Sequence, residues 1–175
     1  MSIKTEIVAR VLDGRLKKLT ALVPGKVEVR KIYLTTNVLD ALNGKDVTGL
    51  EAHLFGIAQA RLEQFIGGDE FVCRLPPSRR PSRGKDVPAL AMLEPADDQV
   101  WEFPIGTLRL FGRFAARDVF VVTNWGLRQL LDDDEKKWRF VIQTCKTEWT
   151  KLFHPFSPLS GVHMHEYLSN ARTPV

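Results

Sequence analysis

Apolar residues recur at helical spacing in three stretches of the chain, residues 3–22, 48–66 and 136–153. In each stretch the spacing places apolar side chains on one face of a helix. Gly14 is a point at which the first helix can break, and Thr48 with Glu51 fits a capping box at the start of the second. The third stripe predicts that Val141, Ile142 and Cys145 are buried on one face of a helix through residues 136–152.

Segments rich in β-branched and aromatic residues predict strands at residues 27–34, 100–105, 108–114 and 118–125. Shorter helices are predicted around residues 37–43 and within 162–170. These elements predict an α+β fold in one domain, residues 1–175. We expect an antiparallel sheet of about four strands with helices packed on one face. Extra helices are expected at the N-terminal and C-terminal ends of this unit.

Two segments lack a regular pattern. Residues 74–99 contain five prolines and a run of basic residues, and proline removes backbone donors and fixes φ. This segment is predicted to be a long exposed loop, cut first by trypsin after Arg79, Arg80 or Arg83. Residues 155–175 are predicted to be a loosely structured tail.

Composition narrows the class of protein. The chain has 175 residues, of which 44% are hydrophobic and 26% charged, with a net charge of +4. These values are typical of a globular domain, and the mild positive charge is compatible with a nucleic-acid partner without requiring one. No run of eighteen apolar residues predicts a membrane span, and the charged N-terminal segment lacks the features of a signal peptide. We therefore expect a cytoplasmic protein.

Metal and cofactor motifs are absent from the sequence. Cys73 and Cys145 are far apart, and we expect both to be small buried residues. His163 and His165 lack further ligands at zinc-site spacing, so a surface position is preferred for them over a metal site. The sequence has no phosphate-binding loop, dinucleotide-binding glycine motif or nucleophile elbow. No metal and no cofactor are expected.

The strand at residues 108–114 carries the clearest candidate chemistry. Alternation along a strand places Arg109, Phe111 and Arg113 on one face. Guanidinium groups bind phosphates and aromatic rings stack on unpaired bases, so this basic face suits RNA. An alternative is that another element covers Phe111 and that the arginines pair with the acidic residues 132–135. Gly112 can also mark a bulge that turns Arg113 away from Arg109.

A family resemblance adds a second line of inference. The segments Trp101-Glu102-Phe103, Leu108-Arg109-Leu110-Phe111 and residues 118–123 follow one another as strands. Together with the order strand, helix, loop, three strands and helix, they resemble the RelE/ParE-like toxin superfamily, in its HigB or phage Gp49-like branch. The resemblance covers mainly residues 100–128. The basic segment that follows the last strand in this family is represented here only by Arg128.

The resemblance implies an endoribonuclease that acts on RNA or on the ribosome, with the 2′-hydroxyl of the RNA as nucleophile. Arg109, Arg113 and Arg128 would be its catalytic cations, and Glu102 is the candidate base. Further nucleic-acid contacts are expected from Arg79, Arg80, Arg83, Phe111 and Arg117. The resemblance also implies a small antitoxin-like protein partner. Two other interpretations are open: a non-enzymatic phage or mobile-element protein that masks a protein or nucleoprotein partner, and an accessory protein without a nucleic-acid role.

Overall fold

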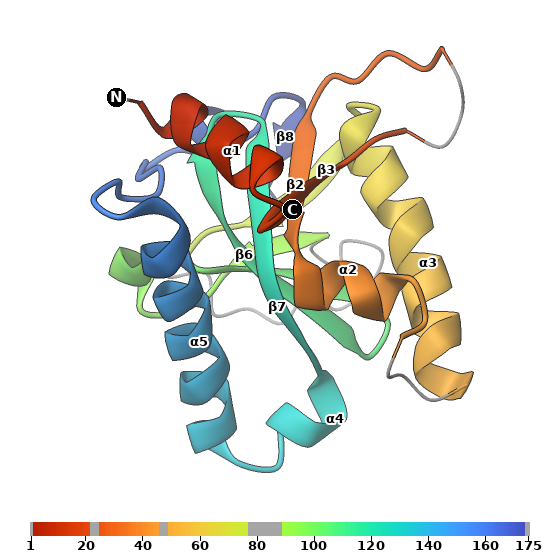
Figure 1. The fold of residues 1–175 in the computed structure, drawn as a ribbon. Helices are drawn as coiled ribbons and strands as arrows, with labels where there is room; N and C mark the ends of the chain where they lie inside the picture. Colours follow the sequence, from red (N-terminus) through yellow and green to blue (C-terminus); the bar gives the residue numbers. More distant parts are fainter. Residues whose placement is uncertain (1, 22–24, 46–48, 77–88, 174–175) are drawn as a thin grey trace.

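In the computed structural model, one mixed sheet forms the centre of the molecule (Figure 1). The structure describes residues 2–21, 25–45, 49–76 and 89–173. Within these ranges the strand order is β1-β2-β7-β6-β5-β4-β3-β8. The bounds are Leu16–Leu19 for β1, Lys31–Thr35 for β2, Phe71–Arg74 for β3, Leu90–Met92 for β4, Trp101–Ile105 for β5, Leu108–Ala116 for β6, Val119–Leu127 for β7 and Ala171–Arg172 for β8.

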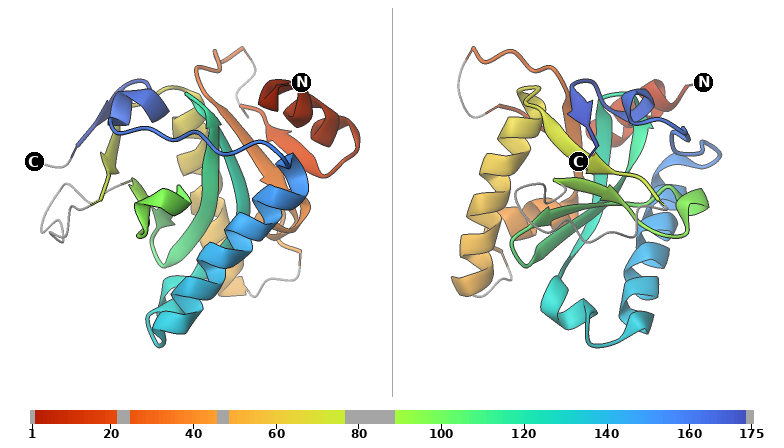
Figure 2. Two further views of the ribbon diagram at one scale, coloured as in Figure 1. Left: turned by 90° about the vertical axis from the view of Figure 1, so that its left-hand side faces the viewer. Right: turned by 180° about the vertical axis from the view of Figure 1, so that it is seen from behind.

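Helices cover both faces of this sheet, as the side and back views show (Figure 2). Helices α2 (Thr36–Leu42) and α3 (Gly49–Ile66) cover one face, and α1 (Ile3–Leu12) and α5 (Glu135–Phe153) cover the other. The remaining helical segments are α4 (Arg128–Leu131), the 3-10 turn η1 (Ala96–Asp98) and α6 (Met164–Tyr167). Asp134 caps α5, because its side chain accepts a hydrogen bond from the amide of Lys136 at 2.8 Å.

The larger core lies between the sheet and α2 and α3. Its aromatic side chains make edge contacts, such as Phe65 with Phe71 at 5.5 Å and Trp101 with Phe114 at 5.3 Å between ring centroids. A smaller core on the opposite face joins Ile7 of α1 to Trp149 of α5. Both sheet faces are therefore apolar along the central strands, which is the pattern of a sheet buried on two sides.

The class α+β is confirmed, but the predicted sheet of about four antiparallel strands with helices on one face is wrong. The pairs β2/β7, β3/β4 and β3/β8 are parallel, and the other neighbouring strands are antiparallel. Strands β1, β3, β4 and β8 were not expected, since each spans only two to four residues. Such short strands carry too few positions to show an alternating pattern.

Three segments differ from the sequence prediction. The helix expected over residues 3–22 ends at Leu12, and after a turn at Gly14, which has φ +81°, the chain enters β1. Within the predicted loop 74–99, residues Leu90–Met92 form the buried strand β4, while the expected cleavage points at residues 79, 80 and 83 lie outside the described residues. Thr48 of the capping box lies outside them as well.

The predicted tail, residues 155–175, is ordered by buried contacts in its described part. Tyr167 is fully buried, and its hydroxyl donates to the side-chain oxygen of Gln99 at 2.6 Å. The carbonyls of Ser169 and Asn170 accept hydrogen bonds from the guanidinium of Arg30, which is fully buried and also lies over the ring of Phe65. The C-terminal segment therefore forms part of the core.

Candidate functional site

The alternation predicted for β6 is confirmed, and α5 covers the resulting face. Arg109, Phe111 and Arg113 contact groups on the α5 side, whereas Leu110 and Phe114 pack toward α2 and α3. The ring of Phe111 is fully buried and meets Trp138 of α5 edge-on, with 6.1 Å between ring centroids. Phe111 therefore has no free ring face for a nucleobase, as the alternative interpretation expected.

A bulge in β7 leaves the face of β6 unchanged. Phe111 pairs with Asn124 and Gly112 pairs with Val122, so Thr123 is the additional residue. A Cβ on Gly112 would lie 2.2 Å from the carbonyl oxygen of Val121. Glycine is required here by close approach of the two strands, and Arg113 is not turned away from Arg109.

At one end of this face, Glu102 and Arg109 form a buried ion pair. Their side chains are 12% and 7% exposed, and Arg109 Nε lies 3.2 Å from Glu102 Oε2. This contact lacks hydrogen-bond geometry, and Arg109 Nη1 donates instead to the carbonyls of Gly106 and Leu108 at 2.8 Å. Burial raises the pKa of Glu102, while Arg109 opposes that rise. Glu102 is therefore an internal counter-ion of Arg109 and a poor candidate for a free base.

Two further predicted cations, Arg117 and Arg128, are exposed and lie apart on the surface. Arg128 on α4 pairs with Asp132 at 2.9 Å, and its charge joins that of Arg109 in opposing the rise that burial causes in the pKa of Glu102. Arg117 lies in the β6–β7 turn, where its Nε is 3.9 Å from a carboxylate oxygen of Asp118. The structure thus brings Glu102, Arg109 and Arg128 toward one end of the sheet face and leaves Arg117 apart. The acidic residues 132–135 do not pair with Arg109 or Arg113, contrary to the alternative interpretation.

Arg113 lies toward the other end, where it borders a polar pocket of about 410 Å³. The pocket is formed by the residues that follow β4, by the C-terminal half of α5 and by the segment after α5. The side chains with chemical function in its lining are Asp97, Asp98, Arg113, Lys146, Trp149, Thr150, His154, Ser157 and Ser160.

The guanidinium of Arg113 is held by neutral partners. Its Nε donates to the carbonyl oxygen of Asp98 at 3.1 Å, and its Nη2 donates to the same oxygen. Arg113 is 7% exposed and forms no ion pair within the part of the chain that the structure describes. Burial lowers the pKa of Arg113, but an arginine remains charged at any physiological pH. A buried cation without a direct ion pair therefore borders the pocket, where the nearby Asp98 carboxylate compensates its charge in part.

Two further side chains of this pocket carry groups that can take part in binding or proton transfer. Lys146 Nζ lies 2.5 Å from a carboxylate oxygen of Asp98, so its charge is shared with that carboxylate. His154, at the C-terminal cap of α5, is exposed and lines the same pocket. Imidazole is the side chain best suited to proton transfer near neutral pH. Arg113 and Lys146 are two cations that can attract an anion against the carboxylates of Asp97 and Asp98 in the same lining, and His154 can move a proton.

Lys146, Trp149 and His154 were missed by sequence reasoning as members of a site with Arg113. The available signal was that Lys146, Trp149 and Thr150 are spaced i, i+3 and i+4 and so share a helix face. That spacing does not tell which strand the face meets. The residues come together only because α5 crosses β6 and β7.

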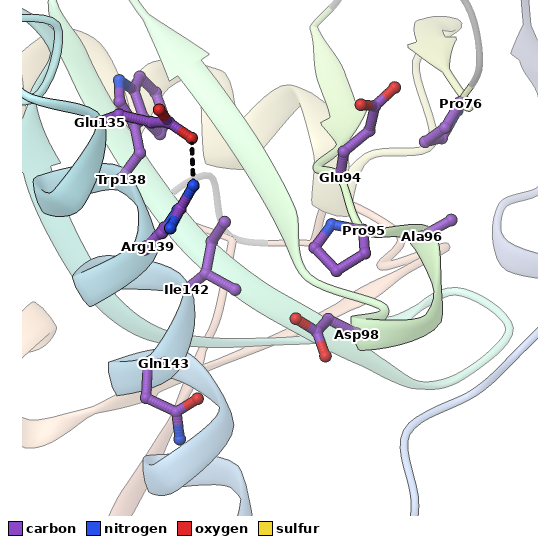
Figure 3. A pocket seen from close by; sticks show the side chains of 10 residues that line it. All are labelled: Pro76, Glu94, Pro95, Ala96, Asp98, Glu135, Trp138, Arg139, Ile142 and Gln143. Carbon is purple, nitrogen blue, oxygen red and sulfur yellow. Dashed lines mark hydrogen bonds and ion pairs between the residues drawn. The ribbon is translucent and has the colours of Figure 1, made fainter.

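A second, larger cleft of about 760 Å³ adjoins the pocket (Figure 3). On the helix side it is lined by Glu135, Trp138, Arg139, Ile142 and Gln143, and across from them by Pro76, Glu94, Pro95, Ala96 and Asp98. Asp98 lines both cavities. The two cavities therefore follow one another along α5, with the segment 94–99 as their opposite wall.

Two negative findings apply to the described ranges. Their His, Cys, Asp and Glu side chains form no group of three or more that could hold a metal ion. Of the helices in these ranges, none combines the length and apolar character needed to cross a membrane.

Comparison of the chain with protein-family models, with curated proteins and with solved structures finds no match.

Proposed function

We propose that the protein binds single-stranded RNA and cleaves it, in the manner that the RelE-like resemblance implies, at the pocket of Arg113, Lys146 and His154. The observation that carries this proposal is the buried Arg113 guanidinium, which forms no direct ion pair with any described carboxylate and borders a polar pocket. A phosphodiester carries a negative charge that can pair directly with Arg113, and it accepts hydrogen bonds in the planar geometry that guanidinium donors favour.

The arrangement of elements supports the same class. Strand β2 is followed by α2 and α3, and the antiparallel strands β5, β6 and β7 are followed by α4 and α5. This is the succession on which the resemblance rests, with additional short strands around it. The proposal moves the reacting centre from Glu102 to the pocket, because Glu102 is already paired with Arg109.

In the proposed cleavage reaction, each of the three pocket residues has one role. Neutral His154 takes the proton of a ribose 2′-hydroxyl, and the 2′-oxygen forms a bond to the adjacent phosphorus. Arg113 and Lys146 stabilise the negative charge of the five-coordinate phosphorus. The bond from phosphorus to the 5′-oxygen breaks, that oxygen takes a proton from water, and the hydroxide so formed takes the proton that His154 holds. The products are a 2′,3′-cyclic phosphate and a 5′-hydroxyl.

Binding is tested by fluorescence anisotropy with a fluorescein-labelled single-stranded RNA. We expect affinity to fall with salt, with a log–log slope of about 0.7 for each phosphate contact. Lys146→Gln should weaken binding, whereas Lys151→Gln on the same helix is the matched control, since Lys151 is exposed, pairs with Glu148 and does not line the pocket. Equal effects of the two substitutions, or no binding at low salt, would refute the proposal.

Cleavage is tested on the same RNA by identifying its ends. Wild-type protein should yield 2′,3′-cyclic phosphate ends, and RNA with 2′-O-methyl groups should bind without being cut. His154→Gln should retain binding and lose cleavage. Binding without cleavage by the wild-type protein would instead support the non-enzymatic alternative, in which the same pocket holds a nucleoprotein partner.

A further inference from the structure

We infer that the 760 Å³ cleft beside Trp138 is a nucleobase subsite that takes guanine, an inference that rests on the proposed RNA function. The cleft adjoins the pocket through their shared residue Asp98. An RNA strand with a phosphate at Arg113 therefore has the cleft as the neighbouring cavity along α5. In single-stranded nucleic-acid sites, bases next to a bound phosphate stack on aromatic side chains along the groove.

The lining of the cleft favours a flat, partly apolar ligand. Trp138, Pro95 and Ile142 supply apolar and aromatic surface (Figure 3). The orientation of the indole is fixed, since Trp138 Nε1 donates to Asp132 at 3.2 Å and the ring meets Phe111 edge-on. An aromatic side chain that borders a cavity in a fixed orientation provides a stacking surface for a base without a large entropy loss on binding.

The charges of the cleft exclude phosphate and select the base. Three carboxylates line it, against one arginine. Glu135 is paired with Arg139 at 2.6 Å, and Asp98 is paired with Lys146. Glu94 has no ion-pair or hydrogen-bond partner among the described residues. A single free carboxylate in a cleft of net negative charge needs neutral N–H donors from its ligand.

Guanine is the base whose Watson–Crick edge presents two adjacent N–H donors, N1–H and the 2-amino group. A carboxylate accepts both in a bidentate contact. Uracil presents one N–H between two carbonyl oxygens, which the carboxylate repels. The backbone on both sides of Glu94 is fixed, since the Leu93 amide donates to the Val100 carbonyl at 2.8 Å and Gln99 Nε2 donates to the Ala96 carbonyl at 2.9 Å, and the Glu94 side chain is exposed to a ligand. Glu94 is therefore the residue that reads the base.

The experiment uses guanosine and uridine, which lack phosphate, and protein labelled with ¹⁵N at its four tryptophans. Trp138→Phe assigns the indole N–H signal of Trp138. We expect guanosine to shift this signal and uridine to leave it unmoved. Glu94→Gln should weaken guanosine binding about tenfold, and Asp133→Asn, which removes an exposed carboxylate outside the cleft, should leave it unchanged.

The same variants are then tested with the RNA hexamers UUGUUU and UUUUUU. Wild-type protein should prefer UUGUUU about tenfold, and Glu94→Gln should abolish the preference while retaining the affinity for UUUUUU. Equal signals for guanosine and uridine at Trp138, or no signal for either, would overturn the subsite even if Lys146→Gln weakens RNA binding. Conversely, guanosine binding that depends on Glu94, with no effect of Lys146→Gln on RNA, would support the subsite and refute the phosphate pocket.

Discussion

The guanidinium of Arg113 lies over the indole ring of Trp149, with 5.7 Å between the guanidinium carbon and the ring centroid. The indole is itself fixed, since Trp149 Nε1 donates to the carbonyl oxygen of Phe156 at 2.9 Å and the ring packs against Phe153. Strand β6, helix α5 and the segment after α5 are thereby joined at one point. The position of the pocket cation depends on this packing.

Replacing Trp149 tests how much stability this junction provides. Trp149→Ala should lower the free energy of unfolding by about 3–5 kcal/mol, because it empties a site that is 2% exposed. Phe140→Ala on the same helix is the control: Phe140 is 71% exposed, so its loss should change stability by less than about 0.5 kcal/mol. Urea unfolding measures both. Similar values for the two variants would show that α5 does not depend on its buried face.

The Glu102–Arg109 pair should behave as a coupled unit. Removing one member leaves the other charge buried without its partner, so Glu102→Gln or Arg109→Met should each destabilise the fold by about 3–5 kcal/mol. The double variant should lose less unfolding free energy than the two single variants lose together, since it leaves no uncompensated charge. Additive losses in urea unfolding would mean that the two side chains do not interact energetically.

Gly112→Ala tests the close approach of β6 and β7. The added Cβ would lie 2.2 Å from the Val121 carbonyl oxygen and 2.8 Å from the ring of Phe120, so the backbone must shift. We expect a loss near the upper end of the roughly 1–3 kcal/mol typical of overpacking. Gly56→Ala on α3 is the control, because a Cβ there meets nothing within 4 Å. Thermal melting of the two variants should separate them clearly.

The two thiols predict how stability changes in alkaline solution. Burial raises the pKa of Cys73 to about 12 and that of Cys145 to about 11, from an ordinary value of 9.0. Because the folded pKa lies above the unfolded one, the stabilisation is complete below pH 9 and is lost as pH rises toward 11 or 12. At pH 10, ionisation of each thiol in the unfolded chain should lower the free energy of unfolding by about 1.4 kcal/mol.

The check is the pH dependence of urea unfolding between pH 8 and pH 10.5, compared with Cys73→Ala and Cys145→Ala. Each alanine variant should be less stable at pH 8 but should lose less stability with rising pH than the wild type. Parallel curves for wild type and variants would contradict the raised pKa values. Both thiols should also react slowly with alkylating reagents in the folded protein, as their confirmed burial requires.

The central strands and the long C-terminal helix could be predicted from sequence because their apolar residues recur over many positions at the spacing of a strand or of a helix. Burial of Val141 and Cys145 is confirmed, whereas Ile142 is only partly buried and lines the cleft. The apolar stripe could not separate these positions, since a cleft edge and a core both favour isoleucine. The pattern predicts a helix at β1 because Leu16 and Leu19 are spaced i, i+3 as on one helix face, whereas in the strand they pack on opposite faces of the sheet.

The candidate site was only partly accessible to sequence reasoning. The shared face of Arg109, Phe111 and Arg113 follows from alternation, which a strand imposes on its own residues. Coverage of Phe111 by Trp138 and the meeting of Arg113 with Lys146 depend on where α5 crosses the sheet. That crossing is set by long-range packing, for which no local pattern exists.

The hydrogen bonds of Arg30 determine the order in which the fold can be completed during synthesis. Its acceptors at Phe65 and Asp69 are 35 and 39 residues away, whereas those at Ser169 and Asn170 are 139 and 140 residues away. A nascent chain on the ribosome has exposed the first pair long before the second pair is made. Burying the guanidinium with half of its acceptors missing is unfavourable. The sheet therefore closes fully around Arg30 only after residues 169–170 have been made and can accept its hydrogen bonds.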